Sequence, residues 1–426
     1  MIRHDAKSDS RLSRRKLLAG GAIGAAGITA LPAFAKSLVA RPPVANSVVD
    51  LGLPNRPSQR ALTSEFPGKR EMILQRIRPP LLETPLSAFN QGVITPNDRF
   101  YVRWHWNEIP GQIDAATFRL KLHGHVEREI ELSLDQILHG FERIEYTAVN
   151  QCSGNSRGLF VPPVPGAQWG HGAMGNARWT GVRLRDVLAR AGLKPGAVDV
   201  RFAGLDEALL PDAPKFRKSL AAEHAMDGEV LIAFAMNGVQ LPLLNGFPLR
   251  LVVPGWYSTY WVKMLSDIEV LPRKDDNYWM TKAYLVPKAP FGNVAPGVDD
   301  YPKEPISRMV PRSLVTNLAE GQRVAAGRPL AVSGIALGGD CGVAKVEIST
   351  DHGATWRMAK LGEDAGKYSF RRFDLAVPVP AAGTLPVTCR CTNTAGVSQP
   401  LAMNWNPGGY MRAGVETVTV IAGGGA

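Results

Sequence analysis

Apolar and polar residues alternate differently in two long parts of the chain. From about residue 90 to 285, after a Pro-rich leader, short β-branched runs are separated by glycine turns and by a few stretches with helical spacing. Residues 184–192 form one such stretch, with apolar residues three or four positions apart and Gly192 placed to end the helix. This mixture predicts an α+β fold for the first part.

The second part follows a Pro/Gly-rich connector at residues 287–305 and has almost no helical period. Its alternating segments predict strands at 330–335, 343–349, 369–375, 385–392 and 415–421, with residues 349–356 as the turn and return strand of a hairpin. Strands at such intervals predict an all-β, immunoglobulin-like sandwich. We therefore expect an α+β domain over residues 36–300 and a sandwich domain over residues 301–426.

The first 35 residues have the pattern of an export signal. Arg14 and Arg15 precede a Gly/Ala-rich, mildly apolar run that ends at Ala33-Phe34-Ala35, an A-x-A cleavage site. We interpret residues 1–35 as a twin-arginine signal peptide, so we expect a periplasmic protein. An uncleaved membrane anchor is the alternative, but glycines and Pro32 interrupt the run, and no later stretch is apolar and long enough to span a bilayer.

Charge narrows the choice of partners. The sequence has a formal net charge of +11, and removal of residues 1–35 takes away six Lys or Arg and two Asp, which leaves +7. This balance favours an anionic substrate or an acidic partner. No basic run is interleaved with aromatic residues, which argues against a nucleic-acid partner.

The cysteines argue against both a disulfide framework and covalent haem. Four cysteines are few for a chain of 426 residues, and no C-x-x-C-H motif for a c-type haem occurs. Cys389 and Cys391 lie on one face of a predicted strand, so we expect them to pair with Cys341 or to stay reduced rather than to bond each other. If the protein transfers electrons, they must leave to another protein.

Cys152 stands in a different setting from the other cysteines. It follows the β-rich run 144–149, so we expect it at the end of a strand. Gly154 and Gly158 let the backbone approach a bulky ligand, and Arg157 adds a positive charge. A thiolate in this position can bind a soft metal. The alternative is that a lone cysteine is a small, buried, apolar side chain.

Five separated motifs favour the metal ligand. They are Arg103-Trp104-His105, the cysteine segment 152–158, GAMGNARWTGV at 172–182, NGFPLR at 245–250 and Trp261-Val262-Lys263. In this order they resemble the sulfite oxidase family of molybdenum enzymes. The resemblance implies a molybdopterin-binding catalytic domain over residues 36–300 and a dimerisation domain over residues 301–426. With NPGGYMR at 406–412 and the export signal, the chain most resembles bacterial periplasmic sulfite dehydrogenases that reduce cytochrome c.

The resemblance also implies roles for matching residues. Cys152 matches the cysteine that binds molybdenum beside the dithiolene sulfurs of molybdopterin. The expected catalytic residues are Arg103, His105, Arg157 and Tyr284. The expected cofactor-binding residues are Phe100, Tyr101, Val102, Arg103, Trp104, Cys152, Asp206, Asn245, Arg250, Trp261, Val262 and Lys263. Asn245 departs from the pattern, because the animal enzymes have histidine there.

The implied reaction is the oxidation of sulfite to sulfate at a molybdenum-molybdopterin centre. Arg103 and Arg157 would hold the oxyanion with planar charged donors, Tyr284 would donate a hydrogen bond to the oxygen in transit, and His105 would help to set the local charge. The animal enzymes carry a haem domain ahead of the molybdenum domain, where this chain has only a leader. A separate c-type cytochrome is therefore the expected electron acceptor.

Several alternatives stay open at the level of sequence. The same scaffold is compatible with oxidation of protein-bound sulfane sulfur and with reduction of a sulfoxide or an N-oxide. A protein of another class, a cofactor-free periplasmic binding or structural protein, would also contain an ordinary sandwich. The expected assembly is either a homodimer or a heterodimer with a cytochrome subunit.

Overall fold

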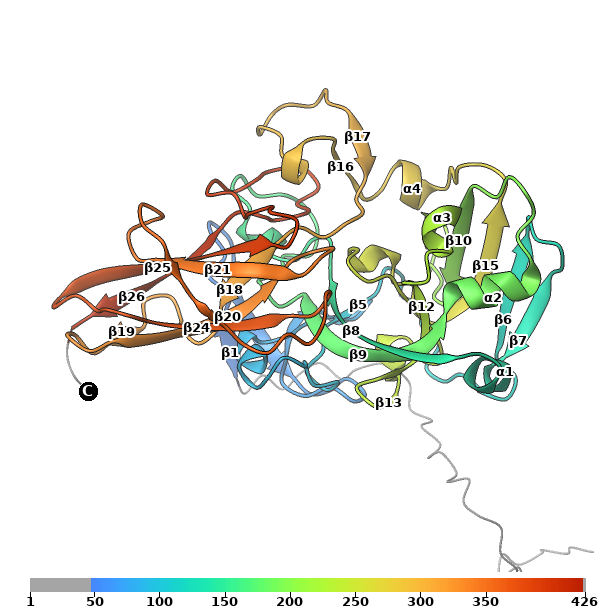
Figure 1. Cartoon of the computed structure of the whole chain (residues 1–426), viewed down its shortest axis with the longest axis horizontal. Helices are drawn as coiled ribbons and strands as arrows, with labels where there is room; N and C mark the ends of the chain where they lie inside the picture. Colours follow the sequence, from blue (N-terminus) through green and yellow to red (C-terminus); the bar gives the residue numbers. More distant parts are fainter. Residues whose placement is uncertain (1–46, 424–426) are drawn as a thin grey trace, which may run out of the picture. The chain divides into compact units, whose positions relative to one another are not determined.

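The computed structural model describes residues 47–423, and the expected export signal lies outside them (Figure 1). Within this range the chain is mostly β-sheet, with four short α-helices. No helix of the described residues combines the length and the apolar character that crossing a membrane requires. The expected combination of helices and strands is therefore present, but strands are far more common than helices.

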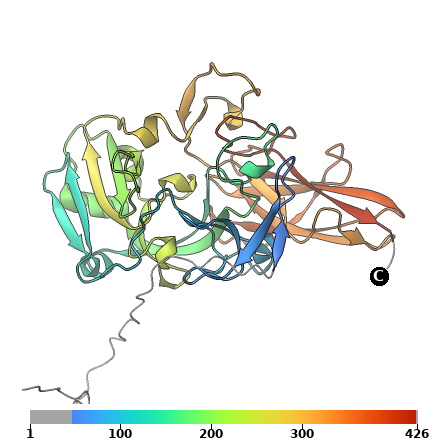
Figure 2. The same cartoon turned by 180° about the vertical axis from the view of Figure 1, so that it is seen from behind.

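The sequence predicts a Pro-rich leader for the part of the chain before residue 90. This part instead contains most of a five-stranded sheet, seen in blue in Figure 2. Its order is β1-β2-β3-β4-β5, with β1 at Val48–Asp50, β2 at Gln59–Thr63, β3 at Met72–Arg76, β4 at Leu81–Glu83 and β5 at Val102–Arg103. These strands are too short, and too often flanked by proline, to show a clear alternation in the sequence. The sheet brings Arg103, on β5, beside β4.

Two further sheets complete the first part of the chain. One has the order β11-β10-β15-β6-β7: Arg217–Ala221, Asp199–Gly204, Leu265–Leu271, Arg119–Gly124 and Ile130–Ser133. The other has the order β13-β12-β9-β8, with β14 paired to β12: Val239–Gln240, Leu231–Met236, Met174–Arg183, Arg143–Gln151 and Arg250–Val252. The long antiparallel pair β8–β9 ends with Gln151 opposite Met174, so Cys152 leaves the sheet directly after its last pair.

The helices are short and lie between the strands. They are α1 at Leu134–His139, α2 at Leu184–Ala191, α3 at Ala222–Ala225 and α4 at Tyr278–Thr281. Single 3-10 turns are η1 at Leu86–Asn90, η2 at Arg157–Leu159, η3 at Leu243–Asn245, η4 at Ser258–Tyr260 and η5 at Pro290–Gly292. The prediction for α2 is confirmed, because Gly192 ends this helix with a φ of 71°, a conformation that favours glycine.

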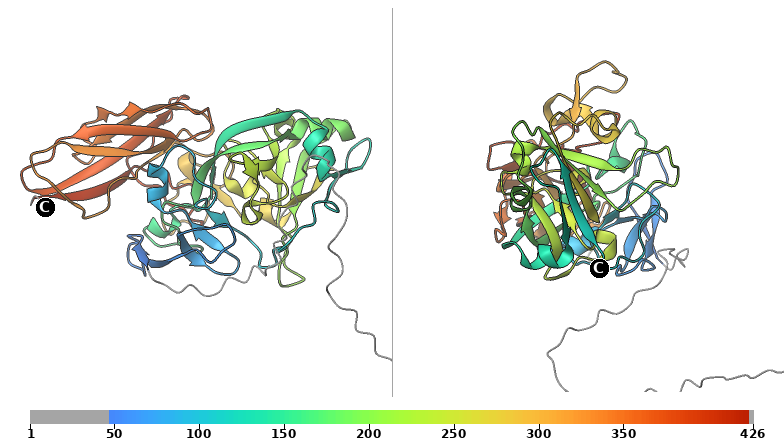
Figure 3. Two further views of the ribbon diagram at one scale, coloured as in Figure 1. Left: turned by 90° about the horizontal axis from the view of Figure 1, so that it is seen from below. Right: turned by 90° about the vertical axis from the view of Figure 1, so that its right-hand side faces the viewer.

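The connector and the C-terminal part contain strands joined by loops, shown in orange to red in Figure 3. In the connector, β16 at Leu285–Pro287 pairs with β17 at Lys303–Pro305. One sheet then has the order β18-β20-β24-β23: Arg312–Val315, Leu330–Leu337, Arg371–Val377 and Lys360–Leu361. The other has the order β19-β26-β25-β21-β22: Arg323–Val324, Glu416–Ala422, Gly383–Asn393, Val343–Ser349 and Arg357–Met358.

These two sheets share one apolar core. Val332 and Phe373 from the first sheet are buried in the same cluster as Val346, Val387 and Cys389 from the second. All five predicted strands are present, and the predicted hairpin forms, although its return strand β22 at Arg357–Met358 lies just after the predicted residues 349–356. A two-sheet domain is thus present, while the immunoglobulin-like topology stays a prediction.

No disulfide joins cysteines within residues 47–423. Cys389 and Cys391 are buried, and burial raises the pKa of the Cys389 thiol to about 12. A neutral thiol reacts slowly in disulfide exchange. Of the two expected states, pairing with Cys341 or staying reduced, the structure has these cysteines as free thiols.

Candidate active site

The segment after β8 forms a tight loop around Cys152. The backbone N–H of Cys152 donates to Ala173 O at 2.9 Å, and the N–H of Asn155 donates back to Cys152 O at 2.9 Å. The side chain of Asn155 accepts from the backbone N–H of Ala173 at 2.9 Å, which ties the loop to the start of β9. Cys152 therefore lies at a strand end, as the sequence predicts, and is only 6% exposed.

Glycines in and beside this loop make room for the guanidinium of Arg157. A Cβ on Gly154 would lie 2.4 Å from Nη2 of Arg157, and a Cβ on Gly166 would lie 2.9 Å from its Nη1. The Nε of Arg157 donates to Gly408 O at 3.2 Å, which fixes the plane of the group. Arg157 is thus held in a narrow slot, with its two Nη groups left for another acceptor.

Cys152 lies on the wall of two cavities, together with Arg103, His105 and Tyr284. We name the first the Arg250 cavity, lined by Tyr101, Val102, Arg103, His105, Asn150, Cys152, Ser153, Phe216, Leu244, Asn245, Arg250, Ser258, Thr259, Trp261, Lys263 and Tyr284. We name the second the Arg157 cavity, lined by Arg76, Leu81, Arg103, Trp104, His105, Cys152, Gly154, Arg157, Pro165, Gly166, Ala167, Trp169, Tyr284, Pro407, Gly408 and Tyr410.

The two cavities differ in size. The Arg157 cavity measures about 340 Å³, enough for a small anion with its water. The Arg250 cavity measures about 20 Å³, close to the space that one water molecule needs. Flexible side chains on its wall, including those of Arg250 and Lys263, would have to move to admit a pterin.

The Arg250 cavity is rich in buried positive charge. Arg250 donates through Nη1 to Asn245 O at 2.9 Å and through Nη2 to the Asn150 side-chain oxygen at 3.1 Å. Burial lowers the pKa of Arg250 to about 10. Burial, with the charge of Arg250 next, lowers the pKa of Lys263 to about 7. Both shifts reflect the cost of burying a positive charge, a cost that a bound anion would offset.

A buried lysine holds Asn245, the residue that departs from the family pattern. Lys69 Nζ donates to the side-chain oxygen of Asn245 at 2.7 Å and to Phe100 O at 2.9 Å. The side-chain nitrogen of Asn245 donates to Tyr101 O at 3.2 Å. Both ends of the amide are therefore bonded to the chain, and Asn245 lines the cavity wall.

His105 and Tyr284 form a hydrogen-bonded pair at the junction of the cavities. His105 Nε2 lies 2.5 Å from the Tyr284 hydroxyl, and the imidazole stacks on Phe216 with ring centroids 3.6 Å apart. Burial, followed by the charges of Arg103 and Lys263, keeps the pKa of His105 well below its ordinary value. A histidine with a lowered pKa is neutral near pH 7, so His105 would influence the site through its contact with Tyr284 rather than through a positive charge.

Tyr284 is held in an unusual backbone conformation. Its φ is 57°, a left-handed value that costs a residue with a side chain about 1–3 kcal/mol. Burial raises the pKa of its phenol, and the charge of Cys152 raises it further, whereas Arg103 and Arg157 lower it. The hydroxyl is therefore protonated at neutral pH and can act as a hydrogen-bond donor.

Unpartnered polar atoms show that the Arg250 cavity suits a polar ligand. Arg103 Nη1, Arg250 Nε, Asn150 Nδ2 and Ser153 Oγ are buried without a hydrogen-bond partner. A buried polar atom in this state costs about 1–3 kcal/mol unless a ligand satisfies it. Several donors converging beside a thiol fit a polar, anionic group such as a phosphorylated pterin with its metal.

The structure brings most of the expected residues to one place. Arg103, His105, Arg157 and Tyr284 all line the Arg157 cavity, and eight expected cofactor residues line the Arg250 cavity: Tyr101, Val102, Arg103, Cys152, Asn245, Arg250, Trp261 and Lys263. Trp104 lines the Arg157 cavity instead. Phe100, Asp206 and Val262 are buried but line neither cavity, and the Phe100 ring packs edge-on against Trp179 with centroids 5.8 Å apart.

Sequence reasoning missed several wall residues. Asn150 and Ser153 flank Cys152, so their position beside the motif could have identified them. Tyr410 lies within the NPGGYMR segment, which carried the resemblance but received no role. Phe216 and the buried Lys218 had no signal, because only the folded chain brings them beside His105.

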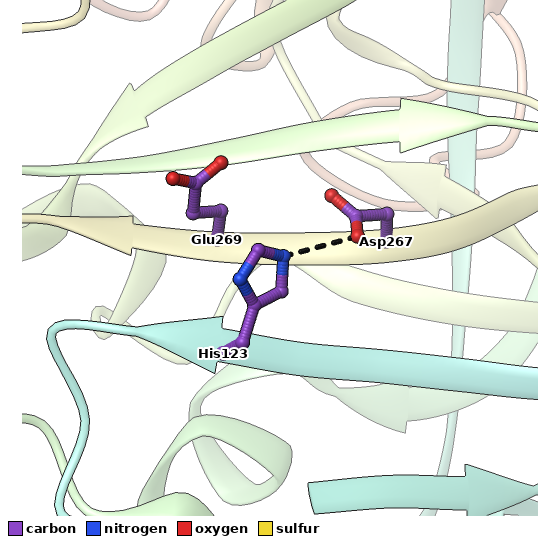
Figure 4. Close-up of side chains that lie close together, drawn as sticks. All are labelled: His123, Asp267 and Glu269. Carbon is purple, nitrogen blue, oxygen red and sulfur yellow. Dashed lines mark hydrogen bonds and ion pairs between the residues drawn. The ribbon is translucent and has the colours of Figure 1, made fainter. Parts of the chain in front are cut away.

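Another group of potential metal ligands lies outside these cavities (Figure 4). His123 on β6 and Asp267 and Glu269 on β15 have ligand atoms within 4.8 Å of one another. However, His123 Nε2 is paired with Asp267 at 3.0 Å, and Glu269 accepts from Arg201. These contacts already engage all three side chains, so the group is explained by hydrogen bonds and an ion pair between strands.

Two protein families match this chain, and sulfite oxidases are similar to it in sequence. Residues 106–279 match the oxidoreductase molybdopterin binding domain family, and residues 303–421 match the Mo-co oxidoreductase dimerisation domain family. Human mitochondrial sulfite oxidase is 36% identical over 354 residues, covering 78% of this chain and 63% of the human protein. Chicken (Gallus gallus) sulfite oxidase is 33% identical over 348 residues, covering 77% of this chain and 73% of the chicken protein.

A solved structure is also similar. The sulfane dehydrogenase SoxCD from Paracoccus pantotrophus superposes with a TM-score of 0.68 at 26% identity, over 79% of this chain and 83% of that chain. The chain spans less than two thirds of the human protein and about three quarters of the chicken protein. The two matched ranges include Cys152, Arg157 and the C-terminal sheets almost to their end, whereas Arg103, His105 and Tyr284 lie outside both.

Proposed function

This chain belongs to the sulfite oxidase family of molybdopterin enzymes, and from that premise we propose that it oxidises sulfite to sulfate and passes the electrons to a c-type cytochrome. Family membership gives it a molybdenum-molybdopterin cofactor and an oxidoreductase activity on sulfur. The observation that supports sulfite is the placement of Arg103, Arg157 and Tyr284 around the Arg157 cavity, which Cys152 also lines.

The residues of the chain have distinct parts in this reaction. When bound, the molybdenum centre supplies the transferred oxygen atom and takes up two electrons. Cys152 would be its protein ligand, and Arg250 and Lys263 would hold the anionic end of the pterin. Arg103 and Arg157 would bind the oxyanion of sulfite through charge-assisted hydrogen bonds.

Tyr284 and His105 would act on the oxygen in transit. The phenol of Tyr284 is protonated, because burial raises its pKa, so it donates a hydrogen bond. His105 is neutral and lies 2.5 Å from this hydroxyl, so it can orient the phenol without adding charge to the cavity. Overall, sulfite and water give sulfate, two protons and two electrons, and two ferric cytochromes accept the electrons one at a time.

Assembly and location belong to the same proposal. The match of residues 303–421 to a dimerisation domain supports a homodimer. The twin-arginine pattern of residues 1–35 supports export to the periplasm, where c-type cytochromes can serve as acceptors. We also propose that residues 36–300 and 301–426 are the catalytic and dimerisation domains.

A second candidate is the oxidation of sulfane sulfur. The structural similarity to a sulfane dehydrogenase supports it, since that protein superposes over 79% of this chain. A sulfane sulfur held on a carrier is bulkier than free sulfite, so the two substrates place different demands on the width of the Arg157 cavity.

Reduction of ferric cytochrome c by the purified, molybdenum-loaded protein tests the proposal. We expect sulfite to support reduction, with sulfate formed in proportion, and we expect carrier-bound thiosulfate to support little. Sulfoxides should not be reduced when an artificial electron donor is supplied. Reduction that depends on carrier-bound thiosulfate and not on sulfite would favour the second candidate.

A further inference from the structure

A segment of the C-terminal domain forms one side of the Arg157 cavity. Asn406, which is fully buried, accepts through its side-chain oxygen from the backbone N–H of Tyr410 at 3.0 Å and donates to Tyr410 O at 2.9 Å. The same side-chain nitrogen donates to Gly292 O at 3.0 Å. Asn406 therefore fixes the backbone of Tyr410 from both sides.

This segment is fastened to the cysteine loop at two points. Gly408 O accepts from Arg157 Nε at 3.2 Å, and the backbone N–H of Met411 donates to Ser153 O at 3.1 Å. Gly409 between them has a φ of 58°, and a Cβ there would lie 2.8 Å from Cγ of Arg157. Tyr410 thus lies between two residues, Gly408 and Met411, that are both hydrogen-bonded to the cysteine loop. These contacts fix its position relative to Cys152.

The ring of Tyr410 contacts two residues of the proposed substrate site. The Arg157 guanidinium carbon lies 4.9 Å from the centroid of the Tyr410 ring, a cation–π contact. The ring also stacks on Tyr284, with centroids 5.4 Å apart and planes at 23°. The backbone at Gly154 and the Tyr410 ring both contact the guanidinium, so Tyr410 completes the slot in which Arg157 is held.

We propose that Tyr410 is a specificity-determining residue. Its ring keeps Arg157 in position and closes one side of the Arg157 cavity, which favours small free sulfur oxyanions over sulfur groups carried on a larger molecule. This inference rests on the proposed oxidation of sulfite and extends it to substrate size. It gives the C-terminal domain a place in the active site, in addition to its match to a dimerisation domain.

Organic sulfinates provide a suitable probe of size. Benzenesulfinate carries the same oxyanion and sulfur lone pair as sulfite, with a phenyl ring in place of one oxygen. Sulfinate and water give sulfonate, two protons and two electrons, and two ferricyanide ions accept these electrons. The ratio of kcat/KM for benzenesulfinate to that for sulfite therefore measures discrimination by size, without involving a cytochrome.

Variants at Tyr410 separate its ring from its hydroxyl. We expect Tyr410→Ala in the holoenzyme to raise the sulfite KM about tenfold, through loss of the cation–π contact, and to raise the benzenesulfinate-to-sulfite ratio about tenfold or more. Tyr410→Phe should keep the wild-type ratio, because the ring remains. The matched control is Tyr301→Ala, which removes a ring from a cation–π pair with Lys303 away from both cavities.

Binding of sulfate, measured by calorimetry on the holoenzyme, gives a readout that does not require turnover. We expect Tyr410→Ala and Tyr410→Leu to weaken sulfate binding about tenfold, and Tyr410→Phe to leave it unchanged. An unchanged ratio together with unchanged sulfate affinity in Tyr410→Ala would overturn the inference. A wild-type enzyme that binds sulfate but does not oxidise sulfite would instead count against the proposed function.

Discussion

Single residues give the candidate site its charge and its protonation states. Burial lowers the pKa of Lys263 to about 7 and that of Arg250 to about 10, so a bound anion would stabilise the charged forms of both residues. His105 is neutral, and Tyr284 keeps its proton. Arg76, Arg103 and Arg157 are the cationic side chains on the wall of the Arg157 cavity, and the proposed substrate site uses the last two.

Replacing Arg103 tests this division directly. We expect Arg103→Gln to raise the sulfite KM by at least about tenfold, because a charge-assisted contact contributes about 1.5–3 kcal/mol. Steady-state kinetics with sulfite measures the effect. Arg178→Gln is the control, since Arg178 is exposed on β9. A KM that stays at the wild-type value in Arg103→Gln would remove Arg103 from the substrate site.

At the scale of elements, the loop after β8 is the part that positions the site. It places Cys152 at the strand end and holds Arg157 against the backbone of Gly154. Strand β9 follows this loop and pairs with β8. The buried carboxylate of Glu83 on β4 accepts hydrogen bonds from the backbone N–H groups of Gly170 at 3.1 Å and Gly172 at 2.8 Å. Neighbouring elements thus fix the loop on several sides.

A single methyl group on this loop should displace Arg157. In Gly154→Ala the new Cβ would overlap the guanidinium, 2.4 Å from Nη2, so the flexible arginine must move. We expect the sulfite KM to rise by at least about tenfold while the molybdenum content is retained. Gly92→Ala is the matched control, because nothing lies within 4 Å of its added Cβ. Equal kinetics in the two variants would show that the Arg157 slot does not matter for substrate binding.

The sequence predicts the elements with clear periodicity and misses those that depend on distant contacts. Strand β21 lies at Val343–Ser349 as expected, and α2 ends at Gly192. The short strands β1 to β4 have too few residues to show an alternation. Cys152 could be placed at its strand end, whereas Tyr410 reaches the site only because Asn406 and the cysteine loop hold its segment there.

At the scale of the whole molecule, a buried ionic cluster joins the C-terminal sheets to the cysteine loop. Arg312 Nη2 donates to the Ser156 hydroxyl at 2.6 Å and lies 3.2 Å from Glu416. Ser156 is in turn 2.8 Å from His171 Nδ1, and Arg412 pairs with Glu416 at 2.8 Å. The geometry of the cysteine loop is therefore coupled to the stability of the contact between the two parts of the chain.

This cluster predicts a loss of stability in acid. Burial lowers the pKa of His171 from 6.5 to about 4. Between these values the unfolded chain binds a proton that the folded protein does not, so the free energy of unfolding falls as pH falls. We expect His171 to account for a loss of about 3 kcal/mol over this range. Urea unfolding of wild type and His171→Gln from pH 7 to pH 4 measures the difference.

Glu416 should extend the same trend to lower pH. Burial tends to raise the pKa of this carboxyl, but Arg412 and the other basic groups around it outweigh burial and lower the pKa to about 2. Its contribution to stability is present above its ordinary pKa and is lost as pH falls toward 2.

Parallel pH profiles for wild type and His171→Gln would show that His171 is not the source of the loss between pH 6.5 and 4.

The number of sulfur ligands around molybdenum is the most direct test of the central claim, that Cys152 binds the metal at the junction of the two cavities. X-ray absorption at the molybdenum edge counts these ligands in the purified holoenzyme. We expect Cys152→Ser to retain molybdenum, to have one sulfur ligand fewer than wild type and to lose sulfite oxidation. The same sulfur count in both proteins, or near-normal sulfite oxidation by Cys152→Ser, would contradict the claim.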